Sequence, residues 1–253
     1  MCGGRGTRLG GDAEKPLTPI AGRPMVDRVL GALDRSRVET TVAVVSPHTN
    51  ETREHLAEIT GSAGSAAHRS GLRLIDAPGD GYVADLRYAL TEVDAVDPPV
   101  LTVAADLPLL DGEAVDAVLD AASAANSDSL TVCVPAEQKR ALGVSADAST
   151  EIDGRKVVPA GVNVVGGGSV RSGDSRDEPD ERDADDGTGR DGGEVYRTDD
   201  VRYAVNVNYP SDVRIAERLL AEEIASGPDD AAAPNDDDAE APDGNADTTR
   251  SDP

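Results

Sequence analysis

Short apolar runs alternate with segments of helical periodicity along the first 226 residues of the chain. The apolar runs are hydrophobic at successive positions, which is typical of strands buried on both faces of a sheet. Between them, apolar residues recur at spacings of three and four, which predicts amphipathic helices. The predicted strands cover residues 40–45, 72–77, 99–105, 130–135, 160–165 and 203–208.

This alternation of strand and helix predicts a single α/β domain over residues 1–226, with a largely parallel sheet between layers of crossover helices. The clearest helical stripes begin near Met25, Val83 and Val213. Ligands of such sheets bind at the carboxyl ends of the strands. Polar residues at those ends are therefore the first candidates for a functional site.

Two segments have a composition that does not support packing. Residues 166–194 hold ten acidic and four basic side chains, and residues 227–253 hold nine acidic side chains and one basic side chain. Segments so poor in apolar side chains cannot offset the entropy lost on ordering. We therefore expect a disordered acidic insertion at 166–194 and a disordered acidic tail at 227–253.

The whole chain is acidic, with a formal net charge of −25. Such a surface suits a cytosol with multimolar salt, where charge repulsion is screened within about 3 Å. We expect a halophilic, cytoplasmic protein that does not bind nucleic acid. No secretory leader or membrane span is expected, because the chain has no apolar run of about 20 residues. No feature of the sequence specifies an oligomeric state.

The chain begins with a glycine-rich, cationic stretch, MCGGRGTRLGGDAEKP. Glycines allow successive backbone N–H groups to point at one anion, and Arg5, Arg8 and Lys15 add positive charge. This combination favours binding of a polyphosphate. The spacing is neither that of a P-loop nor that of a dinucleotide-binding GxGxxG motif.

A buried strand normally precedes a glycine loop in such folds, but here Met1 is almost directly at the loop. Either this strand has been lost, or the start of the sequence lies about six residues downstream of the true one, since strands of this kind have about five or six residues. We favour the second explanation. It predicts that the codons upstream of Met1 encode a short apolar run.

The motif GGRGTRL followed by EKP resembles the signature of nucleotidyltransferases, which join a nucleoside triphosphate to a phosphorylated acceptor and release pyrophosphate. The resemblance implies a three-layer, Rossmann-like nucleotidyltransferase fold with a mixed, mostly parallel sheet. It also implies that Arg8 contacts the β- and γ-phosphates and that Lys15 contacts the α-phosphate. The loop around the triphosphate would consist of Gly3, Gly4, Gly6 and Thr7.

Two polar positions are candidates for a metal site. Asp106 ends a predicted strand within LTVAADLPLL, and in the resembled family this aspartate binds Mg²⁺. Asn206 and Asn208 lie in the later stretch YAVNVNYPSD, from which the family often takes a second ligand. Carboxylate and amide oxygens suit Mg²⁺. We expect Asp106 and Asn208 as ligands, with Asn206 as the alternative, and we assign Asp212 to the helix N-terminus.

Two further stretches, APGDGYVADL and VPAGVNVV, resemble the archaeal adenosylcobinamide-phosphate guanylyltransferases. The resemblance implies transfer of GMP from GTP to adenosylcobinamide phosphate during coenzyme B12 synthesis. It places Gly79, Gly81 and Asp85 at the nucleotide. The acceptor would lie near Pro159, Gly161 and Asn163.

Other functions remain open from the sequence alone. A molybdenum-cofactor guanylyltransferase or a sugar-1-phosphate nucleotidyltransferase would carry a similar loop, and a non-catalytic nucleotide-binding protein is the alternative of another class. In each transferase the attacking phosphate oxygen is already ionised, so no general base is required. This agrees with the lack of a histidine or cysteine constellation in the sequence.

Overall fold

A computed structural model describes residues 1–3, 6–10, 13–61, 71–93, 99–146, 148–166 and 193–226. The expected acidic tail lies outside the described residues, as does the expected insertion from residue 167 to residue 192. The helices are η1 (Lys15–Leu17), α1 (Met25–Asp34), α2 (Asn50–Gly61), α3 (Tyr82–Glu92), α4 (Gly112–Ala124), α5 (Ala136–Leu142), η3 (Val201–Tyr203) and α7 (Pro210–Ser226). The strands are β1 (Pro19–Ile20), β2 (Arg23–Pro24), β3 (Thr40–Val45), β4 (Gly71–Asp76), β5 (Val100–Val103), β6 (Ser129–Pro135), β7 (Thr150–Ile152), β8 (Arg155–Val165) and β9 (Glu194–Arg197).

The strands form a mixed sheet system, as the sequence predicts. β3 and β4 pair in parallel, and β6 pairs in parallel with β9. β8 runs antiparallel to β5, β6 and β7, which gives a second sheet with the order β5-β8-β6-β9 and β7 beside β8. β1 and β2 form a short antiparallel hairpin.

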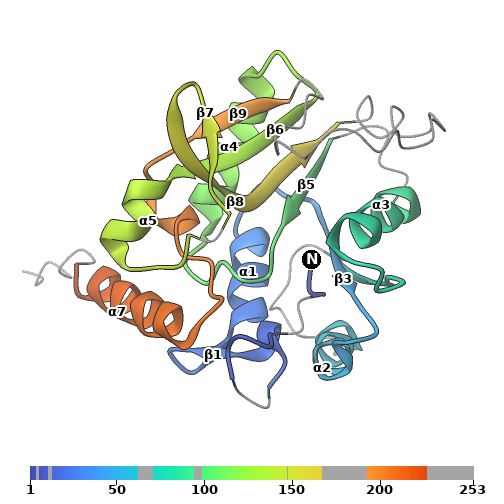
Figure 1. The fold of residues 1–253 in the computed structure, drawn as a ribbon. Coiled ribbons are helices and arrows are strands. Elements are labelled where there is room, and N and C mark those ends of the chain that lie inside the picture. The colour runs from blue at the N-terminus through green and yellow to red at the C-terminus, as the bar shows by residue number, and fades with distance from the viewer. Residues whose placement is uncertain are drawn as a thin grey trace, which may run out of the picture.

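The first two residues bridge these two sheets. The Cys2 amide donates to the Val44 carbonyl of β3 at 2.8 Å, and the Ala105 amide donates to the Met1 carbonyl at 3.2 Å. The Met1 amino group donates to the Val103 carbonyl of β5 at 2.9 Å. The N-terminus therefore lies between β3 and β5, as Figure 1 shows.

Beside these two residues, β3 and β5 enclose a cavity of about 760 Å³. Its walls come from the two strands and from apolar side chains of α1 and α3, including Val26, Leu30 and Leu90. A strand running between β3 and β5 would occupy this position.

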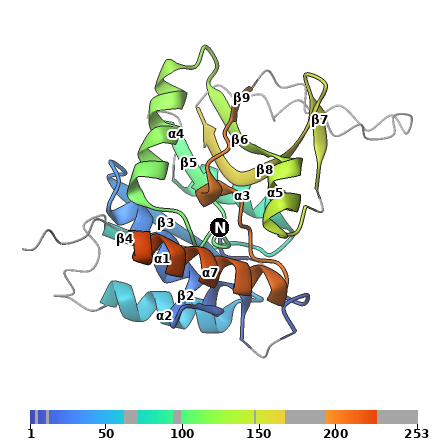
Figure 2. The same ribbon diagram turned by 90° about the vertical axis from the view of Figure 1, so that its left-hand side faces the viewer.

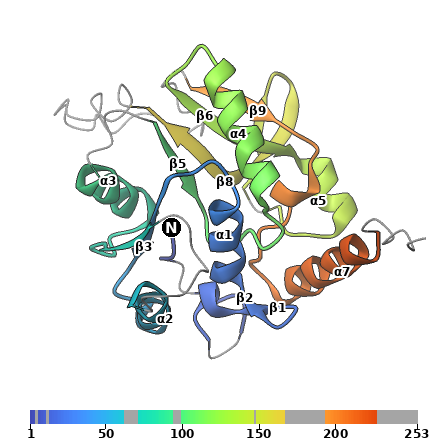
Figure 3. The ribbon, with the colours of Figure 1, turned by 180° about the vertical axis from the view of Figure 1, so that it is seen from behind.

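The alternating side chains of β3 separate two helical layers. Ala43 and Val45 pack with Val26 and Leu30 of α1 and with Leu56 of α2, while Val42 and Val44 face the cluster that holds Ala89 of α3. Because successive strand residues point to opposite faces, α1 and α2 cover one face and α3 covers the other. Figure 3 shows α1 beside α4 on the near face, and Figure 1 shows α3 toward the viewer.

α7 closes the end of the molecule near the β1–β2 hairpin (Figure 2). Its buried residue Ala216 packs in a separate apolar cluster with Ile20, Met25, Val205 and Val207. This cluster joins the C-terminal helix to the segment that follows the glycine loop. No helix in the described part of the chain is both long and apolar enough to cross a membrane.

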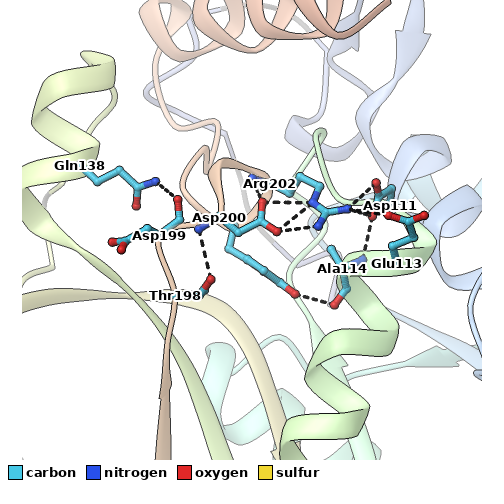
Figure 4. Close-up of polar contacts among 9 residues, drawn as sticks. Asp111, Glu113, Ala114, Gln138, Thr198, Asp199, Asp200 and Arg202 are labelled. Carbon is cyan, nitrogen blue, oxygen red and sulfur yellow. Dashed lines mark hydrogen bonds and ion pairs between the residues drawn. The ribbon is translucent and has the colours of Figure 1, made fainter. Parts of the chain in front are cut away.

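The predicted strand at 203–208 is wrong. Residues 201–203 form η3 instead, and the described residues after it form no ladder, although Val205 and Val207 are buried as the alternating pattern predicted. The Arg202 guanidinium holds the turn by pairing with Asp200 and with Asp111 at the start of α4, at 2.7 Å each (Figure 4). These ion pairs fix a compact turn where a strand would be extended.

Four short strands, β1, β2, β7 and β9, were not predicted. β9 begins at Glu194, so the end of the chain segment assigned to the acidic insertion is ordered. Its pairing with β6 is parallel, with Val195 opposite Thr131. Only long-range pairing explains this strand, since EVYR has a weak local pattern.

Candidate active site

The glycine loop folds back onto Lys15. Gly6 has a φ of +63°, and a Cβ added there would lie 2.9 Å from the Lys15 Cβ. The Leu9 amide donates to the Gly6 carbonyl at 2.9 Å, which closes the turn that contains Thr7 and Arg8. Glycine is required at this position both for its backbone conformation and for the close approach. Gly4 and Arg5 lie outside the described residues.

Glu14 anchors the same loop to α2. Its carboxylate accepts hydrogen bonds from the amides of Glu51 and Thr52, at 3.0 and 2.8 Å. These amides belong to the first turn of α2, where backbone donors lack partners within the helix. Glu14 therefore fixes the chain just before Lys15, and it explains the acidic residue of the EKP motif in physical terms.

The Lys15 ammonium lies between the two expected metal ligands. Its Nζ donates to Asp106 Oδ2 at 2.7 Å and to Asn208 Oδ1 at 2.8 Å. Three segments far apart in the sequence thus meet at one cation, and the side chains of Lys15 and Asp106 remain partly accessible. The arrangement leaves one carboxylate oxygen and one amide oxygen directed at a common point.

The other oxygen of Asp106 is held from the opposite direction. Asn206 Nδ2 donates to Asp106 Oδ1 at 3.1 Å and to the Ala160 carbonyl at 3.0 Å. The Val207 amide also donates to the Asp106 carbonyl at 3.0 Å, which ties the two backbone segments together. Asn206 contacts Asp106 through its amide nitrogen, so its oxygen does not face the point where Lys15 lies.

The Asp212 carboxylate holds the backbone that carries Asn208. This side chain is fully buried, and its Oδ2 accepts from the amides of Asn208 and Tyr209 at 2.9 Å each. Both oxygens also accept from Ser145, from its amide and from its hydroxyl. The sequence assigned Asp212 to the helix N-terminus, and there it orders the backbone that carries Asn208.

Arg8 projects to the same side of the site. Its guanidinium lies 5.9 Å from the centre of the Tyr209 ring, which is within the range of a cation–π contact. Arg8 and Thr7 are both exposed. A solvent-accessible guanidinium is thus available on the rim, beside the segment of Asn208.

The loops after β3 and β4 form a second part of the site. Asp85 is only 5% exposed, and its Oδ1 accepts from the Gly79 amide at 2.8 Å. A Cβ added at Gly3 would lie 3.7 Å from Asp85 Oδ2, so the N-terminal loop passes directly over this carboxylate. Gly79 itself has a φ of +86° and packs against Pro47. Gly81, with a φ of +112°, precedes α3.

The expected acceptor residues lie at alternate positions of β8, which are less buried than the positions between them. Gly161 has a φ of +79°, and a Cβ there would lie 3.0 Å from Ala104 Cβ and 3.6 Å from Asn206 Nδ2. Gly161 thus borders the site. Asn163 lies farther along the strand and donates to Thr102 at 3.4 Å. Pro159 is exposed and pairs with Cys133, at an irregularity between β6 and β8.

Sequence reasoning missed Tyr82. The residue is 49% exposed overall, but its hydroxyl end is largely desolvated and lies beside Thr102. Burial raises the pKa of Tyr82, the nearby Asp106 carboxylate acts in the same direction, and a hydrogen bond with Thr102 opposes them. The sequence signal was the rarity of aromatic residues, since the chain has only five tyrosines and no Phe or Trp.

Comparison with known proteins identifies the family of the chain and several relatives. A family model described as the MobA-like NTP transferase domain matches residues 1–174. The adenosylcobinamide-phosphate guanylyltransferase of Methanocaldococcus jannaschii is 31% identical over 172 residues, which cover 65% of this chain and 78% of that protein. The 2-C-methyl-D-erythritol 4-phosphate cytidylyltransferase of Frankia casuarinae is 37% identical over 115 residues, which cover 46% of this chain and 39% of that protein.

Solved structures support the fold. A CMP:2-keto-3-deoxy-manno-octonic acid synthetase complexed with CTP superposes with a TM-score of 0.57 at 14% identity, covering 85% of this chain and 96% of that chain. This likeness confirms the predicted α/β, Rossmann-like nucleotidyltransferase fold. Together with the family match over more than half of the chain, it establishes that the protein belongs to the MobA-like NTP transferase family.

Proposed function

We propose that the protein transfers GMP from GTP to adenosylcobinamide phosphate, forming adenosylcobinamide-GDP and pyrophosphate in coenzyme B12 synthesis. The relative from Methanocaldococcus jannaschii carries this activity in its name and aligns with 65% of the chain. The observation that carries the proposal is the convergence of the glycine loop, Lys15, Asp106 and Asn208 on one point. Such a point suits the reacting phosphate of a nucleotide.

In this reaction an ionised phosphate oxygen of the acceptor attacks the α-phosphorus of GTP. A new P–O bond forms while the bond from the α-phosphorus to the bridging oxygen breaks, and the electron pair leaves with pyrophosphate. The enzyme therefore needs alignment and positive charge, and no proton has to be removed from the acceptor. We assign Lys15 to the α-phosphate and Arg8 to the β- and γ-phosphates.

The donor set fits a divalent metal. The Lys15 ammonium already occupies a position between a carboxylate oxygen and an amide oxygen, which are hard ligands of the kind that Mg²⁺ prefers. We assign Asp106 and Asn208 as the protein ligands of Mg²⁺. When bound, the metal would neutralise charge on the α-phosphate. Lys15 would then release both oxygens and turn to the nucleotide.

The remaining residues form the walls of the proposed substrate sites. Backbone groups of Gly3, Gly4, Gly6 and Thr7 would line the triphosphate. The buried Asp85 and the turn at Gly79 and Gly81 would hold the nucleoside side, because they adjoin the N-terminal loop. On the acceptor side we assign Gly161 and Asn163, with Pro159 farther out and Tyr82 at the rim.

A second candidate differs in the nucleotide and the acceptor. It is favoured by the 37% identity over 115 residues to the Frankia cytidylyltransferase, whose name specifies a different base and a sugar-like phosphate. Molybdenum-cofactor and sugar-1-phosphate nucleotidyltransferases belong to the same alternative. A non-catalytic nucleotide-binding protein would bind GTP at the same loop and release no pyrophosphate.

Pyrophosphate release separates these functions. The purified protein is incubated with Mg²⁺, each of the four nucleoside triphosphates, and one of four acceptors: adenosylcobinamide phosphate, molybdopterin, a sugar 1-phosphate or 2-C-methyl-D-erythritol 4-phosphate. The proposal expects release only with GTP and adenosylcobinamide phosphate. Release with CTP, or with another acceptor at a higher rate, would replace it with the second candidate, and GTP binding without release would indicate the non-catalytic protein.

A further inference from the structure

Lys139 is a buried lysine beside the candidate active site. It is on α5, its side chain is 1% exposed, and its Nζ donates to Asn206 Oδ1 at 2.9 Å. Burying an ammonium is costly unless it is well paired. The chain has only three lysines among 24 basic residues, and two of the three, Lys15 and Lys139, belong to the network around Asp106.

The ammonium determines how the Asn206 amide is oriented. A lysine ammonium is only a donor, so the group that faces it must be the amide oxygen. The NH₂ group of Asn206 then faces Asp106 Oδ1 and the Ala160 carbonyl, to which it donates at 3.1 and 3.0 Å. Both ends of this amide are therefore engaged within the protein.

This orientation has two consequences for the site. The Asn206 oxygen is engaged by Lys139, which leaves Asn208 as the asparagine whose oxygen shares the Lys15 cation with Asp106. The Asn206 NH₂ group holds Asp106 Oδ1, so Oδ2 is the oxygen directed toward Lys15 and Asn208. Mutating a group that is hydrogen-bonded to a metal-binding carboxylate commonly weakens metal binding by about 10- to 100-fold.

We propose that Lys139 is a positioning residue: it orients Asn206, and Asn206 in turn presents a single oxygen of Asp106 to the metal and nucleotide. The proposal rests on the proposed function in one respect, because it takes Asp106 and Asn208 as metal ligands. It adds a residue that lies on a different element, far from the signature motifs, and that contacts neither substrate.

The test measures Mn²⁺ binding by electron paramagnetic resonance in the presence of the non-reactive analogue α,β-methylene GTP. Lys139→Met keeps an unbranched side chain that is one heavy atom shorter, and it removes the donor. We expect it to weaken Mn²⁺ binding by about 10- to 100-fold. Lys139→Gln can still donate to Asn206 Oδ1 without a charge, and we expect it to recover most of the affinity. Lys156→Met, on the exposed start of β8, is the matched control and should bind Mn²⁺ like the wild type.

A double-mutant cycle with Asn206→Ala tests whether the two residues act in one chain of contacts. If they do, Lys139→Met combined with Asn206→Ala weakens Mn²⁺ binding no more than Asn206→Ala alone. Unchanged Mn²⁺ affinity in Lys139→Met, or additive losses in the double variant, would overturn the proposal. If Lys139→Met does not fold, Lys139→Gln provides the test. Weakened Mn²⁺ binding by Lys139→Gln at an unchanged melting temperature would contradict the orientation role, because this variant keeps a donor for Asn206.

Failure of the proposed function would look different. In that case the wild type would release no pyrophosphate from GTP with adenosylcobinamide phosphate, whatever the ratio of Mn²⁺ affinities between Lys139→Met and the wild type. That ratio is measured without turnover and without the acceptor. It therefore tests the positioning role of Lys139 separately from the identity of the acceptor.

Discussion

The Lys15 ammonium bridges Asp106 Oδ2 and Asn208 Oδ1. Under the proposed function these two oxygens must serve a divalent metal while Lys15 serves the α-phosphate. A lysine and a metal then compete for the same ligands until the triphosphate arrives. Binding of metal and binding of nucleotide should consequently favour each other, because each removes part of the cost of the other.

Replacing Lys15 should separate these two roles. We expect Lys15→Met to bind Mn²⁺ in the absence of nucleotide about tenfold more tightly than the wild type, since the competing cation is gone. Its rate of pyrophosphate release should fall on the order of 10²-fold or more, as for the loss of a preorganised charge at a transition state. Titration of Mn²⁺ by electron paramagnetic resonance, and a pyrophosphate assay, measure the two effects.

The control for Lys15→Met is Lys156→Met, which changes the net charge equally at an exposed position. If both variants gain Mn²⁺ affinity to the same extent, the effect is one of overall charge. If neither gains affinity, Lys15 does not compete with the metal. Only a gain in Mn²⁺ affinity that is confined to Lys15→Met supports competition between Lys15 and the metal.

At the scale of elements, the segment between β9 and α7 carries Asn206 and Asn208 without being a strand. Arg202 fixes it through ion pairs with Asp200 and Asp111, and the Tyr203 hydroxyl donates to the Ala114 carbonyl of α4 (Figure 4). The hydrogen bonds that Arg202 donates to Asp200 and Asp111 raise the pKa of its guanidinium, which therefore stays charged. The position of both asparagines therefore depends on a clamp at the start of α4.

Breaking this clamp should lower both stability and activity. We expect Arg202→Met to reduce the free energy of unfolding by about 2 kcal/mol, because two carboxylates lose charged hydrogen bonds. Burial alone would raise the pKa of Asp200, but the hydrogen bonds that it accepts from Arg202 outweigh burial and lower this pKa. A lowered carboxylate pKa adds stability that is present above the ordinary value near 3.8 and is lost as pH falls below it. The destabilisation by Arg202→Met should thus shrink toward pH 3.

Urea unfolding at pH 7 and pH 3 measures this difference. Arg218→Met, on the exposed face of α7 where Arg218 pairs with Glu222, is a suitable control. Exposed pairs of this kind contribute less than about 0.5 kcal/mol. An equal loss in both arginine variants at pH 7 would contradict a structural role for the clamp.

Sequence patterns predicted the elements whose local signals are strong. β3 was predicted with the observed bounds, and α1, α3 and α7 begin within three residues of their predicted stripes. The strand at 203–208 was wrong because alternating burial does not require a pairing strand, as Val205 and Val207 show. β9 was missed because it has only four residues, directly after the acidic segment, and so short a run shows no clear alternating pattern.

Some residues of the candidate site could be predicted from sequence motifs, and others could not. Lys15, Asp106 and Asn208 were placed together from motifs, and the structure brings them within hydrogen-bonding distance. Glu14, Lys139 and Tyr82 were missed, since their relevance depends on which groups they contact in three dimensions. A buried lysine carries no sequence signal of its own burial. Only its rarity in this chain was visible.

At the scale of the whole molecule, the net charge of −25 is the dominant electrostatic feature. Only some of the acidic side chains on the described surface form ion pairs, for example Asp76 with Arg53. Repulsion among unpaired carboxylates favours the unfolded chain at low salt and is screened as the Debye length falls from about 10 Å at 0.1 M to about 3 Å at 1 M. Salt should therefore stabilise this protein.

We expect the melting temperature to rise by several degrees between 0.1 M and 2 M KCl. Differential scanning calorimetry measures it, and NaCl should act similarly if screening is the cause. Sucrose at matched osmolality is the control, because it raises stability without screening charge. A melting temperature that is flat or falls with KCl would contradict the halophilic interpretation of the composition.

The cavity between β3 and β5 is the second feature of the whole molecule. Its volume of about 760 Å³ is several times the roughly 150 Å³ of a cavity that one deleted side chain leaves. Among the described residues, only Met1 and Cys2 connect the two strands by hydrogen bonds across it. The glycine loop follows directly from these two residues. Its position is thus anchored by a very short stretch of backbone.

Filling the cavity should stabilise the fold and the loop together. We expect six apolar residues such as Val-Ala-Leu-Ile-Val-Ala, added ahead of Met1, to form a strand between β3 and β5. Burial of the four large side chains contributes about 6–12 kcal/mol, which offsets about 6–12 kcal/mol for ordering six backbone residues. The new backbone hydrogen bonds, at about 0.5–1.5 kcal/mol each, then give the net gain. At about 2–4 °C per kcal/mol for a domain of this size, the melting temperature should rise by at least 5 °C.

A six-residue Ser-Gly extension is the matched control and should leave the melting temperature unchanged, because it buries no apolar surface. Hydrogen exchange adds a second measurement, since a strand in this position would protect the amides of β3 and β5 that line the cavity. If the apolar and polar extensions behave alike in both measurements, no strand occupies the cavity. In that case the anchoring of the glycine loop depends on Met1 and Cys2 alone.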